Sequence, residues 1–242
     1  MKALLTGHSR GLGAAIADAL LQRGIPVLGL ARADNAFLAE GFPDLLEQVA
    51  LDLADTAAVA GWIAGGQLGQ WLGAEQSILL INNAGTVQPV GSMGQQDPVA
   101  IARAVSLNVS TPLMLAAAVA ALPAAEQRIL HVSSGAGRSA YPGWSVYCAT
   151  KAALDHHARA AQMDQLPGRR ICSLAPGVID TDMQGEIRAT PLAQFPLRER
   201  FESMKKEGAL ASAADCGERL VTYLLSPQFG ALAVADLREQ GA

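Results

Sequence analysis

Short apolar runs alternate with stretches of helical periodicity along this chain, and this alternation constrains the fold more than any other feature. Each run holds three to five residues and is apolar almost throughout. Continuous apolar character is typical of strands buried on both faces of a parallel sheet, because half-exposed strands alternate instead. The expected strands, in chain order, are 2–6, 27–31, 48–51, 78–81, 129–132, 171–174 and 232–234.

Helices are expected between most of these strands. Strands that alternate with helices indicate βαβ units and a parallel sheet. The sequence therefore predicts an α/β fold, with a doubly wound parallel sheet of about seven strands and helices on both faces. We expect one domain over residues 1–242, in which 183–208, more charged and holding two prolines, is a mobile insertion near the carboxyl edge of the sheet. The expected helices are 12–22, 56–62, 98–107, 112–121 and 147–163.

Composition excludes several classes of protein. Half of the residues are hydrophobic and 17% are charged, which excludes a disordered chain. The formal net charge is −4 and Lys and Arg form no block, so neither a nucleic acid nor an anionic membrane is expected as a partner. No metal site or disulfide framework is expected, because the cysteines lack the spacing for either. These cysteines are Cys148, Cys172 and Cys216.

The cytoplasm is the expected location. A strand is predicted at the first residues of the sequence, which leaves no room for a signal peptide. The apolar stretch 113–125 is too short to cross a bilayer.

A glycine-rich turn follows the first expected strand and opens the first expected helix. It reads Thr6-Gly7-His8-Ser9-Arg10-Gly11-Leu12-Gly13. Gly7 permits a tight turn, while Gly11 and Gly13 let the backbone approach a pyrophosphate at the helix N-terminus. A turn of this composition without a ligand is the alternative, and the strand-then-helix context favours a dinucleotide.

The charge after the second expected strand predicts which dinucleotide binds. An NAD site usually carries an acid about 20 residues further on, which binds the ribose 2′-hydroxyl. Arg32 stands there instead, and a guanidinium suits a 2′-phosphate. Ser9 and Arg10 add a hydroxyl and a second cation. We therefore expect NADP(H) over NAD(H), with Asp34 as a loop or cap residue.

Four polar residues are candidates for catalysis. Tyr147 and Lys151 would share one helix face, where an ammonium lowers the phenol pKa from about 10 and makes it a usable acid. Ser134 follows a strand, where its hydroxyl can bind a substrate carbonyl, whereas Ser133 should point to the opposite face. Asn108 lies between two helical stretches, where a break would free backbone groups to hold a water. Taken singly, the first pair could be a surface helix and Asn108 a cap.

Together these motifs resemble the short-chain dehydrogenase/reductase family over nearly the whole chain. The glycine turn, Asp52-Leu53, Asn82-Asn83-Ala84-Gly85, Asn108, Ser134, Tyr147-x-x-x-Lys151 and Pro176-Gly177 occur in the family's order and at its spacings. The resemblance implies a single Rossmann-fold domain and an NADP-dependent enzyme that acts on CH–OH and C=O groups. It also implies a homodimer or homotetramer that pairs helices 98–121 and 147–163.

The resemblance implies a role for each matched residue. Tyr147 would donate the proton to a small-molecule carbonyl substrate, and Lys151 would lower its pKa and bind the nicotinamide ribose. Ser134 would orient the carbonyl, and Asn108 would hold a water. The implied cofactor contacts are Gly7, Ser9, Arg10, Gly11, Leu12, Gly13, Arg32, Asp52, Leu53, Asn83, Ala84, Gly85, Tyr147, Lys151, Pro176, Gly177, Val178 and Thr181.

Residues 143–148 and 175–184 are similar to the sepiapterin reductase and bacterial benzil reductase branch of that family. This implies a vicinal dicarbonyl substrate, either an aromatic 1,2-diketone or a pterin with a diketone side chain. Asp236 lies about where sepiapterin reductases anchor the pterin. One alternative is a 3-oxoacyl-thioester reductase whose partner contacts basic residues in 183–208. The other is a non-catalytic NADP(H) sensor.

Overall fold

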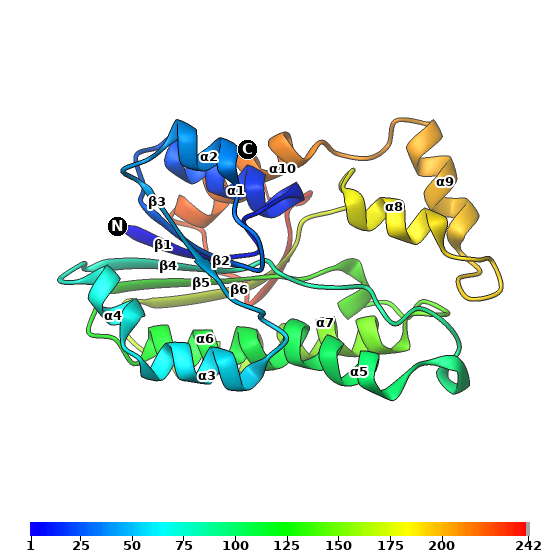
Figure 1. Ribbon diagram of the computed structural model, residues 1–242, viewed down its shortest axis with the longest axis horizontal. Helices are drawn as coiled ribbons and strands as arrows, with labels where there is room; N and C mark the ends of the chain where they lie inside the picture. The colour runs from blue at the N-terminus through cyan, green and yellow to red at the C-terminus, as the bar shows by residue number, and fades with distance from the viewer. Residues whose placement is uncertain (241–242) are drawn as a thin grey trace.

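The computed structural model describes residues 1–240, which fold around one seven-stranded parallel sheet (Figure 1). The strand order is β3-β2-β1-β4-β5-β6-β7, so the chain reverses its winding direction between β1 and β4. All carboxyl ends lie at one edge, on the right of Figure 1. The strands are β1 (Lys2–Thr6), β2 (Val27–Ala31), β3 (Leu46–Ala50), β4 (Ser77–Asn82), β5 (Glu126–Val132), β6 (Arg169–Ala175) and β7 (Val234–Asp236).

Helices cover both faces of this sheet, as the sequence predicts. One face carries α1 (Gly11–Leu21), α2 (Ala36–Gly41) and α10 (Ala213–Leu225). The other carries α3 (Thr56–Ala64), α4 (Gln67–Leu72), α5 (Pro98–Val105), α6 (Thr111–Ala120) and α7 (Ser145–Met163). The predicted doubly wound architecture is therefore confirmed.

The two faces of the sheet have separate apolar cores. The residues of β1 contribute to both of them in turn. Ala3 and Leu5 are buried in the core under α1 and α10, whereas Leu4 is buried in the core of the opposite face. Successive side chains of a strand point to opposite faces, so a sheet covered on both sides needs apolar residues at every position. Each fully buried leucine contributes about 1.5–3 kcal/mol by this transfer.

The segment after β6 differs most from its prediction. Residues 183–208, predicted as a mobile insertion, lie beyond the carboxyl edge and form two helices: α8 (Asp182–Ala189) and α9 (Arg198–Lys206). Ile187, Phe195 and Phe201 of this segment are buried against Trp144. The helices α2, α4 and α10 were not predicted, and β7 begins two residues later than expected.

One helical stretch, Pro98–Ala120, is long and apolar enough to cross a membrane by length and composition alone, although the sequence predicts no such span. A π-turn over Ser106–Ser110 interrupts it. Leu115 and Val119 of its second half are buried in the core beneath the sheet. Core helices of globular domains pass the same test, so this stretch is weak evidence for a membrane span.

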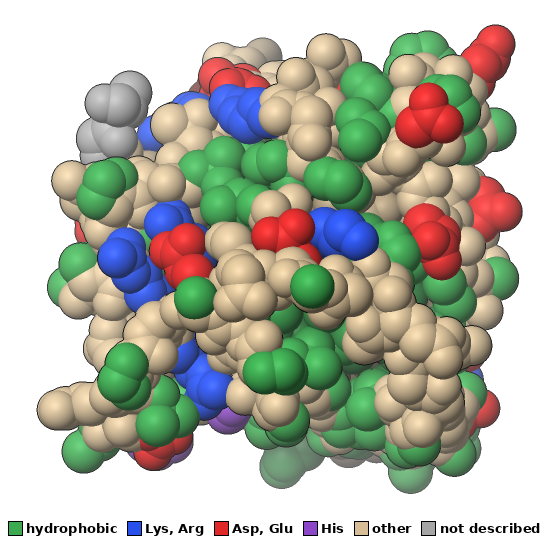
Figure 2. All heavy atoms as spheres, turned by 90° about the vertical axis from the view of Figure 1, so that its left-hand side faces the viewer, with side chains coloured by type: hydrophobic (Ala, Val, Ile, Leu, Met, Phe, Trp, Pro, Cys, Tyr) green, Lys and Arg blue, Asp and Glu red, His purple; other side chains and the backbone are tan. Residues whose placement is uncertain are grey.

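Charged side chains are mixed on the face where the strands begin. Figure 2 shows this face, on which basic and acidic groups lie beside one another among apolar ones. Arg128 illustrates how such a group is accommodated: its guanidinium binds Glu126 at 2.8 Å and the carbonyl oxygen of Leu224 at 2.7 Å. The first positions of β5 thus include charged residues, and the predicted strand, 129–132, did not contain these positions.

Candidate active site

The glycine turn brings α1 against the end of β1 through close backbone contact. Gly7 has a φ of 73° and its amide donates to the carbonyl oxygen of Leu30 at 2.8 Å. A Cβ on Gly13 would lie 1.8 Å from the carbonyl oxygen of Gly7, so no larger residue fits there. Gly11, with a φ of 56°, has the left-handed conformation that favours glycine.

Two helix N-termini meet beside this turn. Arg10 at the N-cap of α1 and Thr181 at the N-cap of α8 make no side-chain cap hydrogen bond within the described residues. A Cβ on Gly11 would lie 3.5 Å from Cγ2 of Thr181, so the two ends are adjacent. Amides without capping partners attract anions, and two such ends beside a glycine turn fit a pyrophosphate. The residues present therefore fit a dinucleotide cofactor.

The two arginines expected at the adenosine end are both exposed. Arg10 pairs with Asp182 at 3.3 Å, and both side chains are about 70% exposed (68% and 71%). An ion pair this open is worth about 0–1 kcal/mol, so a phosphate can displace it. Arg32 is exposed after β2, and Asp34 lies in the loop that follows. Asn35 caps α2 by accepting from the amide of Leu38.

Asp52 and Leu53 lie where the resemblance places adenine contacts. Asp52 accepts a hydrogen bond from the amide of Ala54 at 3.0 Å and pairs with Arg103 at 3.1 Å. The Ala54 amide, followed by Arg103, lowers the pKa of the Asp52 carboxyl. Leu53 is buried, and its carbonyl oxygen accepts from the Thr111 hydroxyl at 2.7 Å.

Asn83 binds the backbone of the glycine turn. Its side-chain amide donates to the carbonyl oxygen of Thr6 at 3.0 Å and to that of Gly7 at 3.3 Å. In return, the Thr6 hydroxyl accepts from the amides of Asn83 and Ala84. Asn83 therefore positions the turn, while Ala84 and Gly85 carry the backbone from β4 toward Asn108 and Lys151.

Asn108 lies in the π-turn between α5 and α6, so the helix is interrupted where the sequence predicts a break. Its side chain is buried and fully engaged: the oxygen accepts from the amide of Thr86 at 2.9 Å. The side-chain nitrogen donates to the carbonyl oxygen of Thr86 at 2.8 Å and to the Thr150 hydroxyl at 3.1 Å. Asn108 thus ties the loop after β4 to α7. Sequence reasoning missed both threonines, because nothing local marks them as its partners.

Tyr147 and Lys151 share a face of α7 and both are buried. The Nζ of Lys151 lies 5.7 Å from the centre of the Tyr147 ring and donates to the carbonyl oxygen of Val132 at 2.7 Å. Burial lowers the pKa of Lys151 to about 8, against the opposing charge of Asp155. A Cβ on Gly85 would lie 3.3 Å from the Asn108 oxygen and 3.6 Å from Lys151 Nζ, so Gly85 stands between these two side chains.

The pKa of Tyr147 differs from its expectation. Burial raises the pKa of the phenol to about 12, and interaction with the Ser134 hydroxyl acts in the opposite direction. Desolvation of the phenolate is the largest influence on this pKa, and Lys151, which we expected to lower it, is not among the groups that shift it. Tyr147 is therefore a protonated phenol over the whole neutral range.

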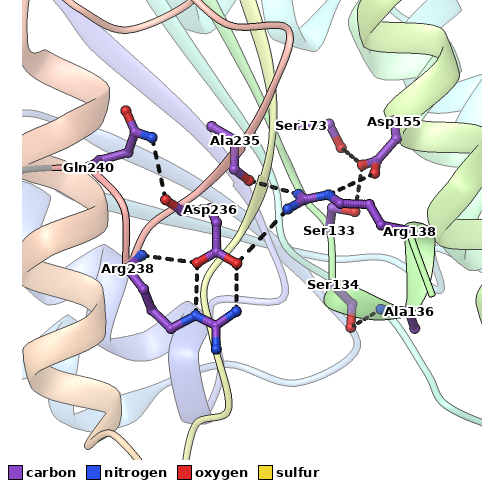
Figure 3. A network of polar contacts seen from close by, with 10 residues as sticks. All are labelled: Ser133, Ser134, Ala136, Arg138, Asp155, Ser173, Ala235, Asp236, Arg238 and Gln240. Carbon is purple, nitrogen blue, oxygen red and sulfur yellow. Dashed lines mark hydrogen bonds and ion pairs between the residues drawn. The ribbon is translucent and has the colours of Figure 1, made fainter.

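The two serines after β5 have different partners, as Figure 3 shows. The Ser133 hydroxyl donates to Asp155 at 2.7 Å, whereas the Ser134 oxygen accepts from the amide of Ala136 at 3.2 Å. Ser134 thereby caps a short turn, and its hydroxyl, not that of Ser133, is the one that acts to lower the pKa of the Tyr147 phenol.

An aromatic cluster covers Tyr147. Trp144 stacks on Phe195 with ring centres 4.6 Å apart, and it lies edge-to-face with Tyr147, with ring centres 5.4 Å apart. Phe201 packs against both Trp144 and Phe195. The indole Nε1 of Trp144 is buried and finds no hydrogen-bond partner among residues 1–240. Sequence reasoning missed Phe195 and Phe201, although two aromatics in an otherwise charged segment are a usable signal.

Asp236 does not offer a free carboxylate. It accepts hydrogen bonds from the backbone amide of Arg238 at 3.0 Å and from both ends of its guanidinium at 2.9 and 2.7 Å. These bonds hold the pKa of Asp236 below its ordinary value. Pro176, Gly177 and Val178 follow β6 close by, and a Cβ on Gly177 would lie 3.5 Å from Cδ of Arg238.

Several known proteins match most of this chain. The family model for short chain dehydrogenase matches residues 1–192. A benzil reductase ((S)-benzoin forming) from Bacillus cereus is 31% identical over 98% of this chain and 93% of its own. A sepiapterin reductase from Meriones unguiculatus is 33% identical over 96% of this chain and 94% of its own.

A solved structure extends the match to the fold. A short-chain dehydrogenase/reductase from Burkholderia vietnamiensis is 48% identical, with a TM-score of 0.71, and the match covers 99% of this chain and 98% of that one. Members of this family are oxidoreductases of CH–OH and C=O groups that use NAD(P)(H). With the doubly wound sheet and the glycine turn, these matches show that the chain belongs to the short-chain dehydrogenase/reductase family.

Proposed function

We propose that the protein is an NADPH-dependent carbonyl reductase for small ketones or vicinal diketones. The observation that carries the proposal is that Tyr147, Lys151, Ser134 and Asn108 gather at the carboxyl edge, beside a turn that fits a pyrophosphate. When bound, the nicotinamide cofactor supplies the hydride.

The chain's own residues would handle the proton and the carbonyl oxygen. The Tyr147 phenol, protonated at neutral pH, would donate its proton to the oxygen, and the Ser134 hydroxyl would donate a hydrogen bond to the same oxygen. Lys151, with its pKa near 8, would restore a proton at close to neutral pH. Asn108 would hold the neighbouring loop fixed through Thr86.

Tyr147→Phe tests the enzyme against the sensor alternative. We expect loss of carbonyl-dependent NADPH oxidation with cofactor binding retained, because only the hydroxyl is removed. Turnover at the wild-type rate would contradict the role of Tyr147. If wild-type protein bound NADPH but reduced nothing in a broad carbonyl panel, the sensor alternative would be favoured.

NADPH is preferred in this proposal because Arg32 and Arg10 are free to turn toward a 2′-phosphate. Both are exposed, and Arg10 has only a weak surface partner. Arg32→Ala should weaken NADPH binding while NADH binding stays unchanged, which provides an internal control. Equal loss for both cofactors would place Arg32 outside the phosphate site.

An aryl ketone or aryl diketone is the substrate class that we propose. The buried Trp144, Phe195 and Phe201 cluster packs against Tyr147 and makes the surroundings of this tyrosine aromatic and apolar, which suits an aryl group. The relatives named benzil reductase point to the same class. A panel of benzil, 1-phenyl-1,2-propanedione, sepiapterin and an acetoacetyl thioester, each with NADPH and NADH, tests the assignment.

The acyl-thioester alternative is less well supported. Several cations of residues 183–208 have acidic partners within the chain: Lys205 and Arg188 lie against Asp180, and Arg198 pairs with Glu202. Asp236, bound to Arg238, likewise gives no support to a pterin anchor. Turnover of the thioester alone in the panel would reverse this ranking.

Assembly and location complete the proposal. We propose a homodimer or homotetramer formed through α5, α6 and α7, because Val99, Val105 and Met163 are exposed apolar residues on α5 and α7. Light scattering on purified protein measures this directly.

The proposed location is cytoplasmic, without a nucleic-acid or membrane partner. No group of three or more His, Cys, Asp or Glu within residues 1–240 is arranged to hold a metal ion.

A further inference from the structure

Asp155 is a buried acid in the same helix as the catalytic pair. It lies one turn beyond Lys151 and two turns beyond Tyr147, so all three share one face of α7. Its side chain is only 1% exposed. A carboxylate this deeply buried is costly unless hydrogen bonds satisfy both of its oxygens.

Three donors from different parts of the fold meet this carboxylate (Figure 3). One oxygen accepts from the Ser133 hydroxyl and from the Ser173 hydroxyl, each at 2.7 Å. The other oxygen faces Nε of Arg138 at 3.4 Å. Asp155 therefore joins α7 to the end of β5, to β6 and to the turn that follows β5.

These contacts enclose the segment that carries Ser134. Ser133 precedes it directly, and Arg138 ends the short turn that Ser134 caps. The turn also packs directly on α7, because a Cβ on Gly137 would lie 3.0 Å from the Asp155 oxygen. Asp155 thus holds the segment at both ends, and α7 carries Tyr147. The distance between the Ser134 hydroxyl and the Tyr147 hydroxyl therefore depends on the contacts of Asp155.

Arg138 extends the junction to β7. Its guanidinium donates to the carbonyl oxygen of Ala235 at 2.7 Å and lies 3.9 Å from Asp236. The carboxyl ends of β5, β6 and β7 are therefore linked to the catalytic helix through one buried acid and one arginine.

Asp155 also acts on the charge of Lys151. Burial disfavours the ammonium, and Asp155 is the neighbour whose charge favours it. The other titratable groups facing Lys151 are Tyr147 on α7 and His131 on β5. Both are neutral near pH 7, because the pKa of Tyr147 is raised to about 12 and that of His131 is lowered to about 3 by burial. Removal of the Asp155 charge would leave the ammonium without a nearby anion.

We infer that Asp155 is a positioning residue, which fixes Ser134 relative to Tyr147 and keeps Lys151 beside a negative charge. The expected effect of Asp155 on turnover rests on the proposed reductase function, whereas its expected effect on the charge of Lys151 does not.

Asp155→Asn tests the inference, because asparagine keeps the shape and one acceptor oxygen but removes the charge. We expect kcat to fall by on the order of 10- to 100-fold. The alkaline limb of the kcat pH profile should move down by about one pH unit. The pKa of Lys151, followed by NMR of its labelled ammonium in cofactor-free protein, should move in the same direction.

Ser173→Ala is the matched control. It removes one donor to the same carboxylate from β6, away from Ser134, so it should lower stability without moving the Lys151 pKa. An unchanged Lys151 pKa in Asp155→Asn would overturn the electrostatic part of the inference whether or not a substrate is known. Unchanged kcat beside an active wild type would overturn the positioning part alone.

Ser133→Ala keeps the inference testable if Asp155→Asn does not fold. This variant breaks the tie beside Ser134 and keeps the carboxylate. We expect a lower kcat with an unmoved alkaline limb, and wild-type kcat would contradict the positioning role. A wild type without carbonyl turnover would count against the proposed function, and the NMR titration would still decide the role of Asp155.

Discussion

The glycine turn and the α8–α9 segment (182–206) border the same edge of the sheet but are fixed by different forces. The turn depends on backbone contact, since Gly13 has no room for a single methyl group. The segment depends on side-chain packing, through Phe195 and Phe201 against Trp144. A backbone requirement is visible locally in the sequence because only glycine meets it. Packing partners distant in the chain leave no such local mark.

Gly13→Ala should have the largest effect on this comparison. The added methyl would meet the Gly7 carbonyl oxygen, so α1 must move away from β1. We expect loss of NADPH binding and a decrease of about 3 kcal/mol in the free energy of unfolding. Isothermal titration and urea unfolding measure the two effects. Binding at wild-type affinity would mean that the turn is less constrained than the structure indicates.

Phe195→Ala should affect the segment in a different way. Phe195 is fully buried, so the cavity should destabilise α8 and α9 by about 3 kcal/mol. The cavity should also loosen Trp144 beside Tyr147, so we expect KM to rise for benzil, which needs an ordered wall for its rings, and to change little for the smaller diacetyl. NADPH affinity should stay unchanged, because Phe195 lies outside the glycine turn. Equal changes in KM for both diketones would remove the argument for an aryl site.

The accuracy of the predicted strands likewise depends on whether the deciding feature is local in the sequence. β1 and β2 have their predicted bounds because burial on both faces makes them apolar throughout. The last strand was predicted two residues too early, because Leu232 is apolar but lies 56% exposed before β7 begins. β5 and β6 were predicted too short because each begins with charged residues at the amino edge, such as Arg128.

In the site, local motifs identified Tyr147, Lys151, Ser134 and Asn108 as candidates. The neighbours that hold them were missed: Asp155 was not predicted, although it stands four residues after Lys151. Its partner Ser133 follows β5 and its partner Ser173 lies in β6, and only the fold brings them together. Likewise the pKa of Tyr147 depends on burial, which residue spacing alone does not describe.

The buried ammonium of Lys151 should make stability depend on pH in a definite window. Its folded pKa is lowered from 10.5 to about 8, so the unfolded chain binds more protons between these values. Stability from this group therefore rises as the pH increases from about 8 toward 10.5. The free energy of unfolding of the wild type should therefore rise, relative to that of Lys151→Met, by on the order of 1–3 kcal/mol between neutral pH and pH ~10.

Urea unfolding of both proteins across this range measures the difference. Tyr147 contributes with the opposite sign only above its ordinary pKa of 10.0, because its folded pKa is raised to about 12. A constant difference between wild type and Lys151→Met would mean that the ammonium is better solvated than its burial indicates.

Gly185→Ala should have the smallest effect and isolates the contrast between the two regions. Gly185 lies inside α8, and a Cβ there would have no heavy atom within 4 Å. Alanine is favoured over glycine in a helix interior by about 0.5–1 kcal/mol, so this substitution should stabilise the protein slightly. The same exchange is thus harmful at Gly13 and favourable at Gly185, because one site is closed by backbone and the other is open. A destabilised Gly185→Ala, measured by thermal unfolding, would show that α8 needs conformational freedom at this position, and the contrast with the glycine turn would then fail.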